Sequence, residues 1–198
     1  MIAILDYGSG NLRSAERAFQ IAAEKVVVTQ DPKVCRDARA LVVPGVGAFA
    51  ACMDQLLSVG GAEIIAERVA LARPIFGICV GMQIFFESSS EKIQKSGLGI
   101  FPGNVNQLAA PILPHMGWNT VLPDENSRLF KGIEKDSFYF VHSYAAKNPV
   151  KGAANTFTNY GEDFLAAVEK DFIVATQFHP EKSGAAGAKL ISNWVASL

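Results

Sequence analysis

The chain has 198 residues, a length that fits one domain better than two. Its 18 basic and 19 acidic residues give a formal net charge of -1, so a broad basic surface is excluded and with it a nucleic acid as the main ligand. Hydrophobic residues make up 49% of the sequence and the mean hydropathy is +0.20, which excludes intrinsic disorder.

Membrane insertion and export are not expected either. The charge-free stretch 74–86 is interrupted by glycines and is shorter than the ~18 apolar residues that a membrane span needs. The first residues lack a basic leader and a cleavage site, which predicts a cytoplasmic protein. The cysteines, Cys35, Cys52 and Cys79, have no C-x-x-C spacing, so we expect free thiols rather than a disulfide framework or a zinc site.

The first half of the chain alternates short apolar runs with helical patterns. Strands are predicted over residues 2–5, 26–29, 40–43 and 75–78, and helices over 12–23, 32–38, 49–57, 62–71 and 80–86. Pro44 is expected to end the third strand. Strands that alternate with helices indicate a parallel sheet covered on both faces.

The second half is richer in strands. They are predicted near residues 105–108, 118–122 and 138–144, and two more, 164–169 and 172–177, flank a hairpin turn at Lys170 and Asp171. A closing helix over 184–198 has an apolar stripe of Leu190, Ile191, Trp194 and Val195. The predicted fold is a single α/β domain over residues 1–198, with a mixed, mostly parallel central sheet flanked by helices.

The strongest chemical signal is Gly-Ile-Cys-Val-Gly at residues 77–81, where an apolar strand turns into a helix. It matches the G-x-S-x-G nucleophile turn with cysteine in place of serine. Glycines are needed on both sides because neighbouring side chains would collide in so tight a turn. The partial positive charge of a helix N-terminus favours thiolate over thiol at Cys79.

A cysteine nucleophile needs a base, and His179 is the best candidate among the three histidines because it follows a strand end. Glu181 lies two residues further on, where its carboxylate can bind one ring nitrogen and leave the other for the thiol. One backbone donor to a developing oxyanion is the N–H of Val80, and the glycine-flanked loop at Val46 and Gly47 is a possible second source.

These residues resemble the class I, or triad-type, glutamine amidotransferases, which have a flavodoxin-like fold. Within that class, nearly the whole chain is similar to the glutaminase subunits of imidazole glycerol phosphate synthases. The resemblance rests on Gly-Ile-Cys-Val-Gly-Met-Gln at residues 77–83, Asp-Tyr-Gly-Ser-Gly-Asn-Leu at 6–12, Pro-Gly-Val-Gly-Ala-Phe at 44–49, Pro-His-Met-Gly-Trp-Asn at 114–119, His-Ser-Tyr at 142–144 and His-Pro-Glu-Lys-Ser at 179–183.

The resemblance implies a glutaminase that needs no metal or organic cofactor. Cys79 would be the nucleophile, His179 the base and acid, and Glu181 the residue that orients the histidine. It implies a glutamine site of Gly45, Gln83, Glu91, His142, Ser143 and Tyr144, and a partner interface of Asn11, His115, Trp118, Tyr139 and Lys182. The implied partner is a separate (β/α)₈-barrel cyclase subunit, which receives the ammonia for histidine biosynthesis.

Two alternatives stay open at this stage. The glutaminase of pyridoxal phosphate synthase shares the triad but does not predict the motif at residues 114–119. A non-catalytic binding or chaperone-like protein on the same fold would not require both His179 and Glu181.

Overall fold

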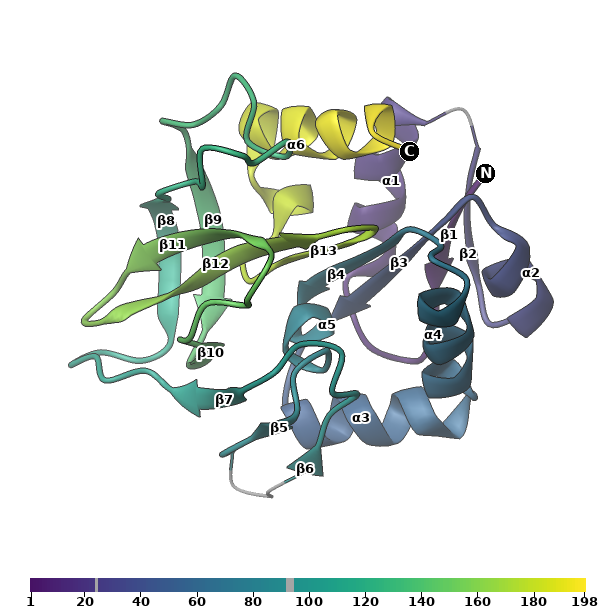
Figure 1. The fold of residues 1–198 in the computed structure, drawn as a ribbon, viewed down its shortest axis with the longest axis horizontal. Coiled ribbons are helices and arrows are strands. Elements are labelled where there is room, and N and C mark those ends of the chain that lie inside the picture. Colours follow the sequence, from purple (N-terminus) through teal and green to yellow (C-terminus); the bar gives the residue numbers. More distant parts are fainter. Residues whose placement is uncertain (24, 92–94) are drawn as a thin grey trace.

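A mixed sheet forms the centre of the molecule (Figure 1). The computed structural model describes residues 1–23, 25–91 and 95–198. The central strands are β1 (Ile2–Leu5), β2 (Val26–Thr29), β3 (Ala40–Gly45), β4 (Ile75–Cys79), β11 (Ala154–Asn159), β12 (Asp163–Lys170) and β13 (Ile173–Thr176). Within these residues the sheet has seven strands in the order β11-β12-β13-β4-β3-β1-β2.

The strand directions confirm the predicted mixed, mostly parallel sheet. Neighbouring strands run parallel through β2, β1, β3, β4 and β13. Strand β12 is antiparallel to both of its neighbours, β11 and β13. Strands β1, β3 and β4 are buried at every position, as their continuous apolar runs require when helices cover both faces. The carboxyl ends of β3 and β4 lie side by side, because Gly45 pairs with Cys79.

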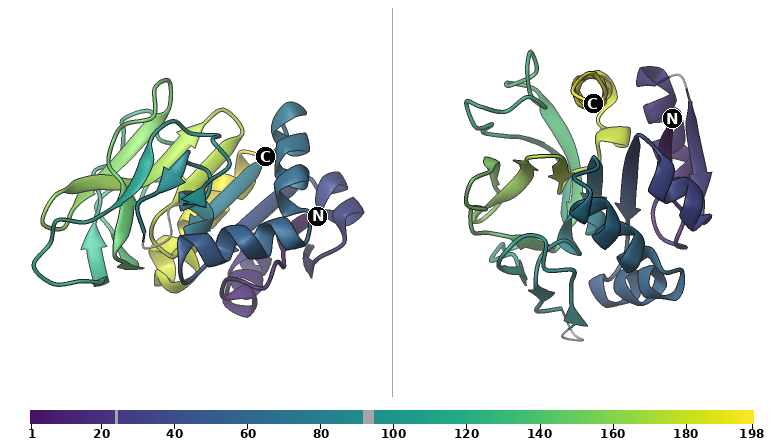
Figure 2. Two further views of the ribbon diagram at one scale, coloured as in Figure 1. Left: turned by 90° about the horizontal axis from the view of Figure 1, so that it is seen from below. Right: turned by 45° about the vertical axis from the view of Figure 1, so that its right-hand side comes forward.

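Helices cover the two faces of the sheet (Figure 2). They are α1 (Leu12–Ala22), α2 (Pro32–Asp37), α3 (Phe49–Ser58), α4 (Gly61–Ala70), α5 (Val80–Gln83) and α6 (Gly184–Ala196), with a 3₁₀ turn, η1 (Pro180–Lys182), before α6. Helices α1 and α6 pack together on one face, and α2, α3 and α4 lie on the other.

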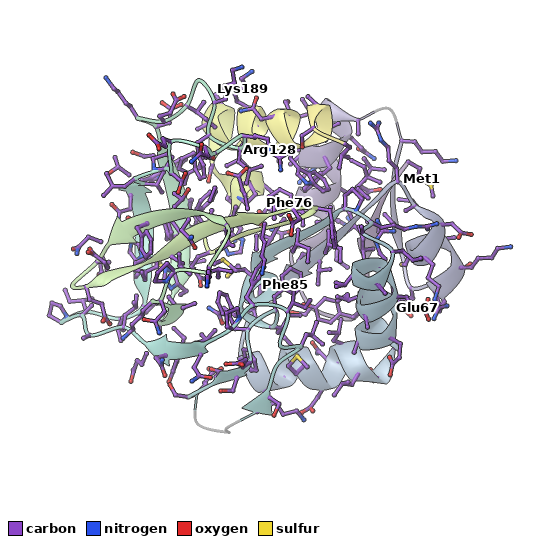
Figure 3. The ribbon with its side chains drawn as sticks, in the orientation of Figure 1. Met1, Glu67, Phe76, Phe85, Arg128 and Lys189 are labelled. Atoms are coloured by element: carbon purple, nitrogen blue, oxygen red, sulfur yellow. The ribbon has the colours of Figure 1, made fainter. Side chains whose placement is uncertain are left out.

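An aromatic cluster joins the α1 and α6 face to the sheet. Phe76 of β4 contacts Phe19 of α1 and Trp194 of α6 edge to face, with ring centroids 5.8 Å and 5.0 Å apart. Each of these rings is buried. Figure 3 places Phe76 inside the molecule, whereas Glu67 and Lys189 lie at its periphery. The predicted apolar stripe of α6 is confirmed for Leu190, Ile191 and Trp194, and Val195 is only partly buried.

Two smaller sheets extend the molecule beside the central one. The first joins β10 (Tyr144–Ala146), β7 (Asn104–Gln107), β5 (Ser88–Ser89) and β6 (Lys95–Ser96), and the second pairs β8 (His115–Thr120) with β9 (Ser137–His142). Strand β9 is tied to the segment after β13, because the N–H of His179 donates to Tyr139 O and the N–H of Tyr139 donates to Ser183 Oγ.

Several predicted boundaries were wrong, and β11 was not predicted. Strand β3 continues through Pro44, since its pairing with β1 ends at Val42 and only β4 remains alongside. Helix α5 ends at Gln83 rather than residue 86, because the carbonyls of residues 84–86 accept hydrogen bonds from residues 98–101. The predicted strand 138–144 divides at Ser143 into β9 and β10, which belong to different sheets.

Within the described residues, no single helix is long and apolar enough to cross a bilayer. Helices α3 and α4 together reach the required length and apolar composition, but the pair is bent by 84°.

A buried guanidinium joins α2, α4 and the approach to β4. Arg68 of α4 is 0% exposed and donates to the backbone carbonyls of Cys35, Ala38 and Pro74 at 2.8–3.0 Å. Burial lowers the pKa of Arg68 to about 10. The side chain therefore satisfies backbone acceptors that are otherwise shielded from water.

We expect Arg68→Met to lower the free energy of unfolding by about 3 kcal/mol, because it leaves these buried carbonyls without donors. Urea denaturation followed by circular dichroism measures the change. Arg13→Met, at an exposed position of α1, is the control and should stay within about 0.5 kcal/mol of the parent chain. Equal losses in the two variants would contradict the structural role of Arg68.

Candidate active site

Cys79 occupies a strained turn between β4 and α5. Its backbone has φ 56° and ψ -111°, in a half of conformational space that residues other than glycine seldom adopt. Such a conformation costs about 1–3 kcal/mol and persists only where the surroundings impose it. The turn carries the chain from the sheet into a short helix and leaves the sulfur at the sheet edge.

The glycines on either side of Cys79 are required by close backbone contacts. A Cβ atom on Gly77 would lie 2.6 Å from the Phe85 ring and 2.7 Å from Gly81 O. A Cβ atom on Gly81 would lie 1.9 Å from Val43 O of the neighbouring strand β3. The predicted reason for the two glycines, a collision of side chains in the turn, therefore has a specific structural basis.

His179 and Glu181 form a buried pair next to this turn. His179 lies after β13, and η1 brings Glu181 back toward the imidazole, so that Nδ1 is 2.7 Å from Glu181 Oε1. The two side chains are 2% and 3% exposed. Because Nδ1 is engaged by the carboxylate, Nε2 is the ring nitrogen left for Cys79, as expected for a nucleophile and base pair.

The charges around His179 favour its protonated form. Burial lowers the pKa of the imidazole, but the negative charge of Cys79 and the Glu181 carboxylate bound at Nδ1 outweigh it and raise the pKa to about 10. The arrangement therefore suits a thiolate and imidazolium pair, with a proton held on His179 for a leaving group.

The loop after β3 adopts a closed hydrogen-bonding arrangement. The N–H of Val46 donates to Ser9 Oγ at 3.0 Å, and Val46 O accepts from Ser9 Oγ at 3.0 Å and from Cys52 Sγ at 3.2 Å. In this conformation the N–H of Val46 is engaged by Ser9, whereas Val80 begins α5, where backbone N–H groups lack partners within the helix. Gly47 has φ 90°, which only glycine adopts freely.

A cavity of about 710 Å³ opens beside Cys79. Most of the residues that the sequence predicted for catalysis and glutamine binding line it. They are Val46, Gly47, Cys79, Val80, Gln83, Glu91, His142, Ser143, Tyr144 and His179, together with Asn11 and Lys182 from the predicted interface. Within the described residues, no group of three or more His, Cys, Asp or Glu side chains is arranged to hold a metal ion.

Two predicted positions differ from expectation. Gly45 lies beneath the cavity, where a Cβ atom would be 2.6 Å from Gly81 N and 2.8 Å from the Tyr7 hydroxyl, so it packs the turn rather than lining the pocket. His115 was predicted at a partner interface, but it is 3% exposed and stacks on Tyr160 with ring centroids 4.0 Å apart.

His115 belongs to a buried pair with His142. Its Nδ1 lies 3.1 Å from His142 Nε2, and His142 Nδ1 lies 3.0 Å from Tyr144 O. Burial lowers the pKa of His115 to about 4, and burial with the nearby His115 and His179 lowers the pKa of His142 to about 3. Both rings are therefore neutral near pH 7, and His142 Nδ1 donates its proton to the Tyr144 carbonyl.

The other predicted interface residues lie at the surface beside the cavity. Trp118 is 59% exposed and meets Tyr139 edge to face, with ring centroids 6.0 Å apart. Lys182 Nζ lies 5.9 Å from the centre of the Tyr139 ring. Asn11 caps α1 by accepting from the N–H of Ser14 at 3.3 Å. Aromatic and cationic side chains thus gather next to the opening of the site.

Sequence reasoning missed two polar residues that contact this site. Ser9 holds the N–H of Val46, and Gln177 lies behind Cys79, with Nε2 3.8 Å from Sγ. In the sequence, Ser9 is one residue of the motif at 6–12, and Gln177 ends the predicted strand 172–177. The signal for Gln177 was its position two residues before His179, which places both near the same sheet edge.

The strained cysteine turn and the buried His-Glu pair have the arrangement expected of a thiol hydrolase site, and comparison with known proteins identifies the family. The model of the family glutamine amidotransferase class-I matches residues 3–198. The chain therefore belongs to the class I glutamine amidotransferase family. A solved structure described as a glutamine amidotransferase superposes with a TM-score of 0.78 over 100% of this chain and 99% of its own, at 16% identity.

Curated relatives of this chain carry a more specific name than the family does. The chain is 55% identical to the imidazole glycerol phosphate synthase subunit HisH of Mycobacterium bovis, over 100% of this chain and 98% of that protein. It is 51% identical to the HisH subunit of Corynebacterium glutamicum, over 98% of this chain and 97% of that protein. Another structure, PurLQS from Thermotoga maritima, shares the fold with a TM-score of 0.71 over 99% of this chain and 97% of its own, at 18% identity.

Because burial lowers the pKa of His115, this residue makes the free energy of unfolding depend on pH. Below pH 6.5 the unfolded chain binds a proton on this histidine that the folded chain does not bind until about pH 4, so the free energy of unfolding falls as pH falls through this window. We expect His115→Phe to remove up to about 1.4 kcal/mol per pH unit of that slope.

Urea denaturation of both proteins between pH 4.5 and pH 7.5 measures this slope. Acid-labile groups that do not contact His115 contribute equally to the two proteins, so the difference between the slopes reports His115 together with its partner His142. Parallel curves for the parent chain and His115→Phe would contradict the burial of a neutral imidazole.

Proposed function

We propose that this chain is the glutaminase subunit of an imidazole glycerol phosphate synthase, which hydrolyses glutamine to glutamate and ammonia and supplies the ammonia to a cyclase subunit. The buried Cys79, His179 and Glu181 arrangement at the edge of a 710 Å³ cavity carries this proposal. Relatives of nearly the same length, named as subunits of that synthase, support the choice of reaction.

The proposed reaction passes through a covalent intermediate. The Cys79 thiolate attacks the side-chain amide carbon of glutamine, and a sulfur–carbon bond replaces the carbon–nitrogen bond to give a γ-glutamyl thioester. His179 gives its proton to the departing nitrogen, which leaves as ammonia. His179 then takes a proton from water, whose oxygen attacks the thioester, and Cys79 leaves again as the thiolate while glutamate is released. Glu181 keeps the imidazole oriented throughout.

Glutamine has a free amino group and a free carboxylate that the remaining cavity residues can recognise. The Glu91 carboxylate, held by the N–H of Phe49 at 2.7 Å, supplies negative charge for an ammonium group. As the family resemblance implies, we place Gln83 with Glu91 beside the backbone end of the bound glutamine, and His142, Ser143 and Tyr144 close this part of the pocket.

The loop at Val46 is suited to control the rate. Val80 N–H is one donor to the developing oxyanion, and rotation of the peptide before Val46 would add a second. Here that N–H is bound to Ser9, which supports a resting state with one donor withheld. Losing one oxyanion donor costs about 10²–10³ in rate, which is enough to keep the unpartnered subunit from wasting glutamine.

The partner is expected to engage the surface beside the cavity. Asn11, Trp118, Tyr139 and Lys182 form our proposed contact for the cyclase, and the exposed indole of Trp118 suits an anchor. Activation then requires the cyclase to bind the rotated loop better than the resting one. A location in the cytoplasm stays a prediction from the sequence.

Full-length similarity to HisH subunits argues against the pyridoxal phosphate synthase alternative. The pairing of His179 with Glu181 at 2.7 Å argues against a non-catalytic binding protein, which has no need of an oriented imidazole.

Glutamate release by the chain alone, with its cyclase, and with cyclase plus a cyclase-substrate analogue tests the function. The rate should rise across the three conditions. Equal rates would contradict the proposed control by a partner, and no glutamate in any condition would contradict the glutaminase assignment.

The triad should lose activity in a graded way. Saturated with cyclase, Cys79→Ala and His179→Ala should release almost no glutamate, whereas Glu181→Ala should retain roughly 10–100 times more activity than His179→Ala, since an orienting carboxylate is the least costly member to lose. Cys35→Ala removes a buried thiol that does not line the cavity and serves as the control. Near-normal turnover in His179→Ala would require another base.

Freeing the Val46 peptide should raise the basal rate. Ser9→Ala removes the acceptor that holds the N–H of Val46, a hydrogen bond that contributes about 1 kcal/mol, so partner-independent glutamate release should rise about fivefold. Ser14→Ala, on the adjacent helix α1, is the matched control. A basal rate unchanged by Ser9→Ala would mean that this hydrogen bond does not limit the resting enzyme.

A further inference from the structure

One buried amide in contact with the sulfur has no part in the mechanism above. Gln177 is 0% exposed, lies just after β13, and donates from Nε2 to Cys79 Sγ at 3.8 Å. Its backbone N–H donates to Ala166 O at 2.8 Å, which anchors the residue to β12. The side chain is therefore held in place next to the nucleophile.

The hydrogen bonds around Gln177 also decide which end of its amide faces the sulfur. A carbonyl can only accept, so Gln83 must turn its NH₂ group toward Tyr144 O, at 2.8 Å. The same Nε2 of Gln83 lies 3.1 Å from Gln177 Oε1. With its oxygen engaged by Gln83, Gln177 presents its NH₂ group to Cys79.

The need for such a donor follows from the length of α5. This helix has only four residues, so its macrodipole gives the sulfur little of the support that a long helix would supply. Negative charge rests on sulfur before attack and again when the thioester breaks. A donor fixed at the sulfur favours the charged form at both stages.

We propose that Gln177 stabilises the Cys79 thiolate by donating a hydrogen bond from Nε2 to Sγ, and that Gln83 holds the Gln177 amide in the orientation this requires. The catalytic use of this hydrogen bond rests on the proposed glutaminase function. The contact between Gln177 and Cys79 is present in the chain without glutamine or a partner, so it can be tested separately from glutaminase activity.

The experiment measures the rate at which iodoacetamide alkylates Cys79 in the full chain between pH 5 and pH 10, with the adduct mapped by peptide mass spectrometry. Gln177→Met keeps the length of the side chain but has no N–H group. We expect the midpoint of the pH profile to rise by about one unit, so that alkylation falls about tenfold at pH values below the midpoint of the parent chain. Gln177→Glu, which adds a like charge beside the sulfur, should shift the midpoint further.

Thr176→Val is the matched control, because Thr176 is the adjacent buried residue of β13 and its hydroxyl donates to Phe178 O rather than to the site. It reports any effect of loosening β13 and should leave the profile unchanged. A parent-like profile in Gln177→Met would overturn the proposal, as would equal shifts in Gln177→Met and Thr176→Val.

A second measurement uses the parent chain and decides the matter if the variants fail to fold. The side-chain amide protons of Gln177, followed by NMR, should shift with pH in step with the alkylation profile of Cys79. Amide signals that do not respond over that pH range would overturn the proposal. Neither readout needs glutamine or cyclase, so failure of the proposed function would be seen in glutamate release and not here.

Discussion

The close approach of Gly81 to Val43 O is the contact on which the site depends. It lets α5 begin directly against strand β3, and this forces the backbone of Cys79 into a conformation that costs about 1–3 kcal/mol. The strain is held by the buried pairing of β3 with β4, whose strands are covered by helices on both faces. The central sheet therefore holds the sulfur at its edge, facing a cavity instead of the core.

The rigid part of the site lies at the end of β3, and the movable part follows it directly in the chain. Gly45 is confined by Gly81 N and by the Tyr7 hydroxyl, which donates to Pro44 O, so β3 stays fixed up to this point. Beyond it, among the described residues, the hydrogen bonds of Val46 go to Ser9 and Cys52, and Gly47 adopts a left-handed backbone. A change in the oxyanion donor can thus occur one residue beyond the packed turn without moving Cys79.

The three histidines differ in which protonation state their surroundings favour. His179 is pushed toward its charged form by Cys79 and Glu181, whereas burial keeps His142 and His115 neutral. Only one histidine near the cavity is therefore suited to hold a transferable proton. The neutral pair instead orients carbonyls and amides, through Tyr144 O and Gln83, around the nucleophile.

Local pattern in the sequence determined the alternating strands and helices and the pairing of His179 with Glu181, because each depends on neighbours within a few residues. The glycines at 77 and 81 also marked the turn at Cys79, although the contact that closes it comes from β3. The tertiary structure decided where β3 and α5 end, since the partners of Pro44 and of the 84–86 carbonyls come from distant segments. It also decided that His115 is buried, that Ser9 holds Val46, and that Gln177 faces Cys79. Contacts across 37 or 98 residues leave no periodicity in the sequence, so only the folded chain brings these residues together.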